Sequence, residues 1–148
     1  MGALAALMVY MAVRDVQTRR IRNWIVLVTA VGALLFWWSI GLPLWPDAAL
    51  RVATAMAVFI VCYVLFLMRL MGGGDVKLAT ALALWFPWAA MIQFLVIMSL
   101  AGGVLSLVVW GDHKIRGKTE KAEVPYGVAI GFATLWLLTQ RFLNHFAG

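Results

Sequence analysis

Hydrophobic residues form long stretches along this chain, and the charged residues are gathered in the short segments between them. The apolar stretches are Gly2–Val13, Trp24–Leu42, Val52–Met68, Leu78–Gly111 and Val124–Gln140. A helix that crosses a bilayer needs about 20 mostly apolar residues, and several of these stretches are close to that length. The pattern therefore predicts a bundle of transmembrane helices.

The fourth stretch is too long for a single span. As one helix it would measure about 51 Å, whereas the hydrocarbon core of a bilayer is about 30 Å thick. Pro87 is the expected break, because proline lacks a backbone N–H and disfavours helix in the residue before it. The prediction is an all-α polytopic membrane protein with about six transmembrane helices, some short or kinked. No internal repeat or linker divides the chain, so residues 1–148 are expected to form a single transmembrane domain without a separate soluble domain.

Composition excludes a soluble globule. Hydrophobic residues make up 65% of the chain and charged residues 12%, against about 45–50% and about 25% in soluble domains. The single cysteine, Cys62, excludes a disulfide framework or a CxxC zinc site within the chain. The net charge of +6 does not indicate nucleic acid binding, since the basic residues lie between apolar stretches rather than in a stripe.

The distribution of basic residues predicts the orientation. Six helices place both termini on one face, and ten of the 12 basic residues fall on the other: Arg14, Arg19, Arg20, Arg22, Arg69, Lys77, Lys114, Arg116, Lys118 and Lys121. The positive-inside rule makes that face cytoplasmic. We expect a multi-pass protein of the cytoplasmic (inner) membrane with both termini outside.

Two of the six acidic residues stand apart. The other four fit solvated turns and loops: Asp47, Asp112, Glu120 and Glu123. Asp15 and Asp75 each lie at the cytoplasmic end of an apolar helix, where a helix-end role is the simple interpretation. An acid within the membrane is costly, however, by about 2.5–3.5 kcal/mol at the centre, so intramembrane acids tend to be functional.

Three glycines, Gly72–Gly74, directly precede Asp75. Glycine permits positive φ and the close approach of another backbone. The P-loop pattern is absent, so a bend that leaves room for an extended peptide beside an acid is the favoured interpretation. Two neighbouring carboxylates that share one proton can activate water for amide hydrolysis. Asp15 and Asp75 form such a pair only if the first and fourth helices are neighbours.

Three segments resemble the motifs of the type IV prepilin peptidases, a family of intramembrane aspartyl proteases. Residues 72–78, GGGDVKL, are similar to the GxGDxKL signature. Residues 15–23, DVQTRRIRN, are similar to the first-aspartate motif, with Arg22 at the usual proline position. Residues 124–129, VPYGVA, are similar to the third conserved stretch.

The resemblance implies that Asp15 and Asp75 are the catalytic pair. It also implies substrate-binding roles for Gly72, Gly73, Gly74, Lys77, Pro125, Tyr126 and Gly127. Substrates of this family are prepilins and pseudopilins, whose basic leader is removed at the cytoplasmic face. The small size resembles the tight-adherence (Flp-type) branch, and a preflagellin peptidase is an alternative. N-methyltransferase activity is not expected, since there is neither room before Asp15 nor paired cysteines.

Two other functions stay open on the residues alone. A small transporter or channel would use Asp15 and Asp75 as ion sites, and an assembly subunit would not need both acids. No metal or other cofactor is expected, because His113 and His145 are predicted on opposite faces. Gly127 and Gly131 suit close helix packing. Expected partners are the substrate helix and the lipid bilayer, with no nucleic acid, and the oligomeric state is left open.

Overall fold

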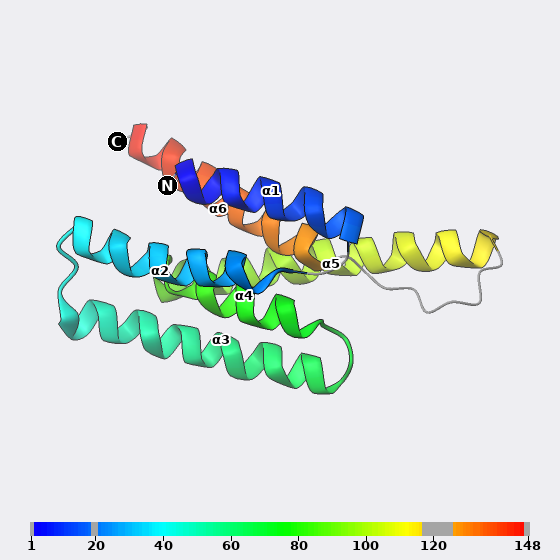
Figure 1. The fold of residues 1–148 in the computed structure, drawn as a ribbon, viewed down its shortest axis with the longest axis horizontal. Helices are drawn as coiled ribbons and strands as arrows, with labels where there is room; N and C mark the ends of the chain where they lie inside the picture. Colours follow the sequence, from blue (N-terminus) through cyan, green and yellow to red (C-terminus); the bar gives the residue numbers. More distant parts are fainter. Residues whose placement is uncertain (1, 19–20, 117–125, 147–148) are drawn as a thin grey trace. The chain divides into compact units, whose positions relative to one another are not determined.

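The computed structural model describes residues 2–18, 21–116 and 126–146, and helix is the regular secondary structure throughout these residues (Figure 1). The six α-helices of the described chain are α1 (Gly2–Thr18), α2 (Asn23–Ser39), α3 (Ala49–Leu67), α4 (Gly73–Ala83), α5 (Trp88–Arg116) and α6 (Tyr126–Phe146). A short kinked segment, η1 (Leu44–Ala48), precedes α3, and Trp45 within it has extended backbone, with φ of −129° and ψ of 132°. The expected all-α architecture is confirmed.

The long fourth stretch is broken where the sequence predicts. α4 ends at Ala83 and α5 begins at Trp88, directly after Pro87. Proline offers no N–H to continue the helix and favours extended backbone before it. The break leaves α4 with 11 residues, a helix of about 16 Å, roughly half the thickness of a hydrocarbon core. The residue at its beginning, Gly73, is therefore separated from its end by only three turns.

Helix boundaries differ from the apolar stretches at the charged ends. α1 continues past Val13 to Thr18, and α5 continues past Gly111 to Arg116. Charged and polar residues such as Arg14 and Gln17 are good helix formers, so a helix does not end where hydrophobicity ends. As a result Asp15 lies inside α1, in its last turn, rather than in the connection that follows.

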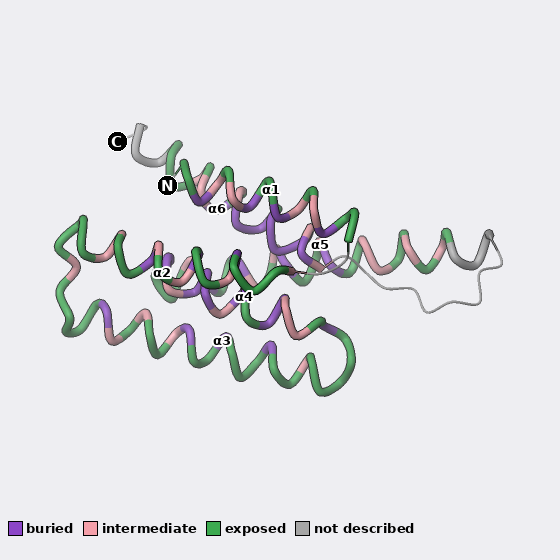
Figure 2. Tube along the Cα trace, viewed as in Figure 1, coloured by how far each residue is buried: buried purple, intermediate pink, exposed green. Residues whose placement is uncertain are grey.

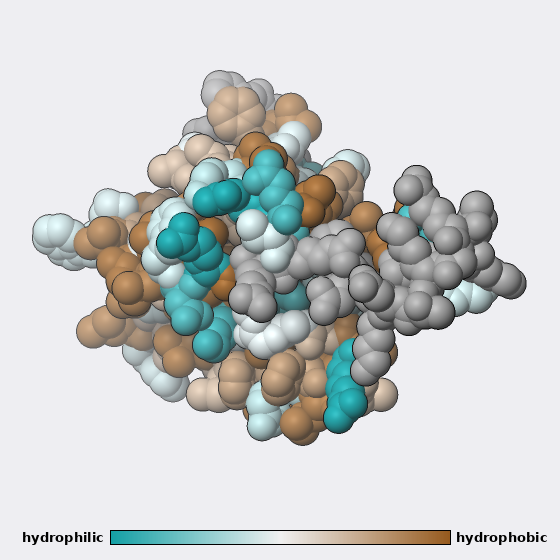
Figure 3. Space-filling model, turned by 45° about the vertical axis from the view of Figure 1, so that its right-hand side comes forward, coloured by the Kyte–Doolittle hydropathy of each residue, from teal (hydrophilic) through white to brown (hydrophobic). Residues whose placement is uncertain are grey.

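Two helical segments of the described chain are long and apolar enough to cross a membrane, Leu44–Leu67 and Trp88–Asp112. α2 is equally apolar but shorter, with 17 residues. Hydrophobic side chains cover much of the surface that Figure 3 shows, and many large apolar residues are exposed, as lipid contact requires. The protein is thus a helical membrane protein. The count of six spans stays a prediction.

The chain forms two compact units. The first contains α1, α6 and the part of α5 from Phe94 onward, and the second contains residues 20–93, with α2, α3 and α4. The expected single-domain organisation stays a prediction.

In the second unit α4 packs against both α2 and α3 (Figure 1). Most of its side chains are buried (Figure 2): Asp75, Val76, Leu78, Ala79, Ala81, Leu82 and Ala83. A helix that is apolar and buried nearly all round is a core helix of its unit. α3, in contrast, leaves many of its large apolar side chains exposed (Figure 2). The short helix that carries Asp75 is therefore held inside the second unit.

The far end of α4 is held by three side-chain hydrogen bonds. The Trp85 indole donates to the Thr29 carbonyl at 2.8 Å. The Trp37 indole donates to the carbonyl of Leu84 at 2.9 Å, and the Arg51 guanidinium donates to the carbonyl of Trp85 at 3.0 Å. The last carbonyls of a helix have no partner within the helix. Trp37 and Arg51 bind the two carbonyls directly after the helix, and the Trp85 indole ties the same segment to α2, so the end of α4 opposite Asp75 is fixed.

α2 and α3 end in the same hydrogen-bonded motif. After α3, the N–H of Leu70 donates to the carbonyl of Leu65 at 3.0 Å, the six-to-one bond of a Schellman cap. The cap requires a left-handed residue, which is Gly41 after α2, with φ of 61°, and Arg69 after α3, with φ of 59°. Glycine adopts this backbone at no steric cost, whereas a side chain costs roughly 1–2 kcal/mol.

Candidate active-site residues

Asp75 lies in the first turn of α4, and the glycines before it form the start of that helix. Gly72 is the N-cap, with φ of −76° and ψ of 149°. The N–H of Gly72 donates to Oδ2 of Asp75 at 3.1 Å, and the aspartate side chain is 9% exposed. The N-terminal end of a helix carries unpaired N–H groups and a partial positive charge. The chain thus places a nearly buried carboxylate where a negative charge is stabilised.

A side chain at two of the three glycines would press on a neighbouring side chain. A Cβ at Gly72 would lie 2.8 Å from Oδ2 of Asp75, and one at Gly74 would lie 3.1 Å from Cβ of Ile21. A Cβ at Gly73 would lie 3.4 Å from Cε2 of Phe66, an ordinary contact distance. The GxGD signature requires glycine at the positions of Gly72 and Gly74 and allows any residue at Gly73. The two required glycines are those at which an added Cβ would lie closest to a neighbouring atom.

The glycines serve close packing rather than unusual backbone angles. Among the glycines that the structure describes, Gly41 has a positive φ, whereas Gly72 is extended and Gly73 and Gly74 are helical. The helix begins at Gly73, so these glycines do not use the positive φ that glycine permits. Room for a substrate peptide beside Asp75 stays a prediction. The space beside Gly73 and Gly74 is filled by Phe66 and by Ile21.

Asp15 lies in the first unit and is 4% exposed. A Cβ at Gly127, in the first turn of α6, would lie 2.6 Å from both Cγ and Oδ2 of Asp15. One turn further, a Cβ at Gly131 would lie 3.2 Å from Cβ of Ala12 and 3.5 Å from the Met8 carbonyl oxygen. α1 therefore packs on a small-residue face of α6, as glycines four apart allow in membrane helices. The predicted packing role of Gly127 and Gly131 is confirmed.

The remaining expected site residues lie in different settings. Tyr126 is half-buried, and its ring packs over Gly102 of α5, where an added Cβ would lie 2.8 Å from Cε1 of Tyr126. Lys77 is exposed. Pro125 lies outside the described residues. The second unit thus brings together Gly72–Gly74, Asp75 and Lys77, and the first unit brings together Asp15, Tyr126 and Gly127. Their contacts with a substrate stay a prediction.

Among the described residues, no group of three or more His, Cys, Asp or Glu side chains could hold a metal ion. Cys62 is buried in α3. The side chains of His113 and His145 lie outside the described part of the chain.

Sequence reasoning missed three neighbours of these residues: Ile21, Phe66 and Gly102. The pair Gly102-Gly103 within an apolar helix is a signal for close packing that could have identified Gly102. Ile21 and Phe66 carry no such signal, because their contacts depend on how the second unit folds.

Comparison with known proteins identifies the family. The sequence model of the type IV leader peptidase family matches residues 2–107, which is most of the chain and includes Asp15, Asp75 and the three glycines. The chain belongs to the type IV leader peptidase family. The resemblance carried by the GxGD segment is thereby confirmed at the level of the family. α6, with Gly127, lies beyond the matched residues.

Two curated relatives cover nearly the whole chain. They are named prepilin leader peptidase/N-methyltransferase, from Burkholderia pseudomallei strains 1026b and K96243. Each is 31% identical over 153 residues, which cover 96% of this chain and 47% of the relative. This member of the leader peptidase family therefore spans about half the length of these relatives. No solved structure matches it.

Proposed function

We propose that this protein is an intramembrane aspartyl endopeptidase that removes the basic leader from type IV prepilins or pseudopilins, with Flp-type prepilins as its substrates. Membership of the leader peptidase family supports the reaction class. One observation carries the assignment of residues: Asp15 and Asp75 are both nearly buried, and each carboxylate is in close contact with a motif glycine, Gly127 or Gly72.

The chemistry requires two carboxylates that share one proton. The ionised carboxylate takes a proton from water, and the resulting hydroxide attacks the carbonyl carbon of the scissile peptide bond. The protonated carboxyl donates its proton to the carbonyl oxygen, and a tetrahedral intermediate forms. The C–N bond then breaks as the nitrogen is protonated. Like charges in close proximity resist double ionisation, so such a pair titrates as one coupled unit.

The helix ends support a division of roles between the two aspartates. Asp75 lies in the first turn of α4 and accepts the N–H of Gly72, whereas Asp15 lies in the last turn of α1. A negative charge is stabilised by about 0.3–1 kcal/mol at the N-terminus of a helix and disfavoured at the C-terminus. Asp75 is accordingly the proposed base, and Asp15 the proposed acid.

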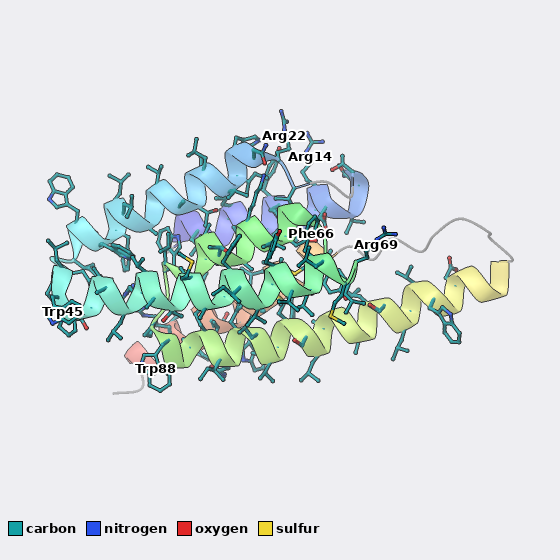
Figure 4. The ribbon with its side chains drawn as sticks, turned by 90° about the horizontal axis from the view of Figure 1, so that it is seen from below. Arg14, Arg22, Trp45, Phe66, Arg69 and Trp88 are labelled. Atoms are coloured by element: carbon teal, nitrogen blue, oxygen red, sulfur yellow. The ribbon has the colours of Figure 1, made fainter. Side chains whose placement is uncertain are left out.

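The arrangement of side chains in the second unit supports cleavage at the cytoplasmic face. In Figure 4, Arg22 and Arg69 lie at one end of this unit, whereas Trp45 and Trp88 lie at the opposite end. Asp75 follows Arg69 closely in the chain and lies on a helix that begins near it. Arginines gather at the cytoplasmic boundary of membrane helices, and the basic leader of a prepilin is cut on that side.

Cleavage of a co-expressed Flp-type prepilin tests the proposal. Wild type should produce a mass loss equal to the leader, and Asp15→Asn and Asp75→Asn should each abolish it, because an amide keeps the shape but cannot exchange the proton. Asp47→Asn is the matched control, since Asp47 is an exposed aspartate in η1. Membrane abundance of all four proteins is compared by immunoblot.

Each outcome of this experiment has a distinct meaning. Cleavage that persists in Asp15→Asn or Asp75→Asn would exclude the carboxylate pair as the catalyst. Wild-type cleavage of another prepilin, but not of an Flp-type prepilin, would retain the peptidase and reject the proposed substrate. No cleavage of any prepilin class by wild type would reject the peptidase and favour the transporter.

A further inference from the structure

Three aromatic side chains form a continuous row along α3, within the second unit. The rings of Phe59 and Tyr63 stack with centroids 5.6 Å apart and planes at 16°. The rings of Tyr63 and Phe66 stack with centroids 6.1 Å apart and planes at 27°. Stacked aromatic rings at these separations attract one another beyond the effect of burial. We call Phe59, Tyr63 and Phe66 the aromatic row.

The aromatic row is open to the surroundings along its length. Phe59 is 38% exposed, Tyr63 44% and Phe66 41%. The last member of the row lies seven positions after the first, so the row covers about 10 Å, roughly two turns of a helix lying beside it. It is therefore long enough to contact a second helix at more than one residue.

The aromatic row ends at the candidate active site. Phe66 lies toward the Arg69 end of the unit, away from Trp45 and Trp88 (Figure 4). Its ring is the neighbour that a Cβ at Gly73 would meet, at 3.4 Å from Cε2. Gly73 follows Gly72, whose N–H binds the carboxylate of Asp75. A helix that follows the row toward Phe66 is brought to the start of α4.

We propose that the aromatic row is the docking surface for the apolar helix of the leader-bearing substrate, and that it directs the inner end of that helix to Asp75. This inference rests on the proposed function. The exposed parts of the three rings form one apolar surface, and because stacking holds the rings against one another, an apolar helix packs on that surface at low cost in side-chain entropy.

Continuity with Asp75 distinguishes this surface from other apolar surface of the protein. Ile60 and Val64 also lie on α3 and are 56% and 48% exposed. Each follows a member of the row by one residue, which places it about 100° further around the helix. These two positions face the same surroundings without belonging to the row. They are therefore matched controls in the same helix.

Site-specific photocrosslinking tests the proposal independently of turnover. Benzoylphenylalanine is introduced at Tyr63 or at Ile60 in the Asp75→Asn protein, which is co-expressed with an Flp-type prepilin. The expected result is a crosslink to the prepilin from position 63 at least about fivefold stronger than from position 60. Equal crosslinking from both positions, or none from position 63, would overturn the docking surface.

Kinetics provide a second, separate measurement. In purified protein with intact Asp75, the double substitution Phe59→Ala and Tyr63→Ala should raise KM for the full prepilin about tenfold, the effect of losing two aromatic contacts. It should leave kcat unchanged, and it should not alter cleavage of a short peptide that spans the cleavage site but lacks the apolar helix. Ile60→Ala with Val64→Ala should change neither constant.

Failure of this inference is distinguishable from failure of the proposed function. If wild type cleaves the prepilin but the row variant has a normal KM, the docking surface is rejected and the peptidase stands. If the row variant loses cleavage of the short peptide to the same extent, the row acts on the fold of the unit and docking is rejected. If wild type cleaves no prepilin, both proposals are rejected.

Discussion

Replacing Gly127 with alanine should displace the Asp15 carboxyl. The added methyl carbon would lie 2.6 Å from Cγ and Oδ2 of Asp15 and 3.0 Å from its Cβ. Non-bonded carbon atoms are most stable at about 3.5–4.0 Å, so the carboxyl or the start of α6 must move by about 1 Å. Three atoms of the same side chain are involved, which makes a small local adjustment insufficient.

The expected loss is mainly catalytic. A displacement of about 1 Å of a catalytic group lowers the rate by about 10²-fold, whereas overpacking of a core lowers stability by about 1–3 kcal/mol. We therefore expect Gly127→Ala to reduce kcat for prepilin cleavage about 100-fold with little change in KM, because Asp15 is proposed to act on the reacting atoms. The thermal midpoint in detergent should fall only modestly.

Two other glycines supply the controls. Nothing lies within 4 Å of a Cβ at Gly103 of α5, so Gly103→Ala should keep full activity and gain stability from helix propensity. Gly131→Ala presses on Ala12 and not on Asp15, and should lower stability while retaining most of kcat. Wild-type kcat in Gly127→Ala would refute the reasoning. An equal loss of kcat in Gly131→Ala would show that activity depends on the tight packing of α1 and not on the position of the Asp15 carboxyl.

Two further series test details of the second unit. Alanine substitution at the three glycines before Asp75 should reduce prepilin cleavage in the order Gly72, then Gly74, then Gly73, following Cβ contacts of 2.8, 3.1 and 3.4 Å. Equal losses measured at equal abundance would contradict this order. At the left-handed helix caps, Arg69→Gly should raise the free energy of unfolding by about 1 kcal/mol and Gly41→Ala should lower it by a similar amount, as denaturation in detergent would show. Opposite signs would refute the cap analysis.

Helix number and the break at Pro87 were predictable because each depends on local chemistry. Apolar stretches separated by charges define helices that lipid can surround, and the missing N–H of proline ends a helix wherever it occurs. Boundaries within charged segments were not predictable in the same way. Arg14 and Gln17 are compatible with both helix and connection, so the extension of α1 to Thr18 depends on packing that the pattern does not contain.

The candidate site was predictable in its residues but not in its contacts. Asp75 and its glycines stand out in the sequence because both glycine and an acidic residue destabilise a membrane helix. Such residues are therefore expected to have a function. The atoms that surround each glycine depend on how the second unit folds. The GxGD signature places Gly73 at its variable position without giving a reason, and the contacts with Asp75, Phe66 and Ile21 supply that reason.

Each of the two aspartates lies against a glycine, and one physical requirement explains both contacts. A carboxylate that must hold or release a proton has to stay in one rotamer. Close neighbours on every side hold a buried side chain in that rotamer. Gly127 and Gly72 bring backbone, rather than a side chain, against Asp15 and Asp75. Backbone cannot change rotamer and, at Gly72, supplies the N–H that binds the carboxylate.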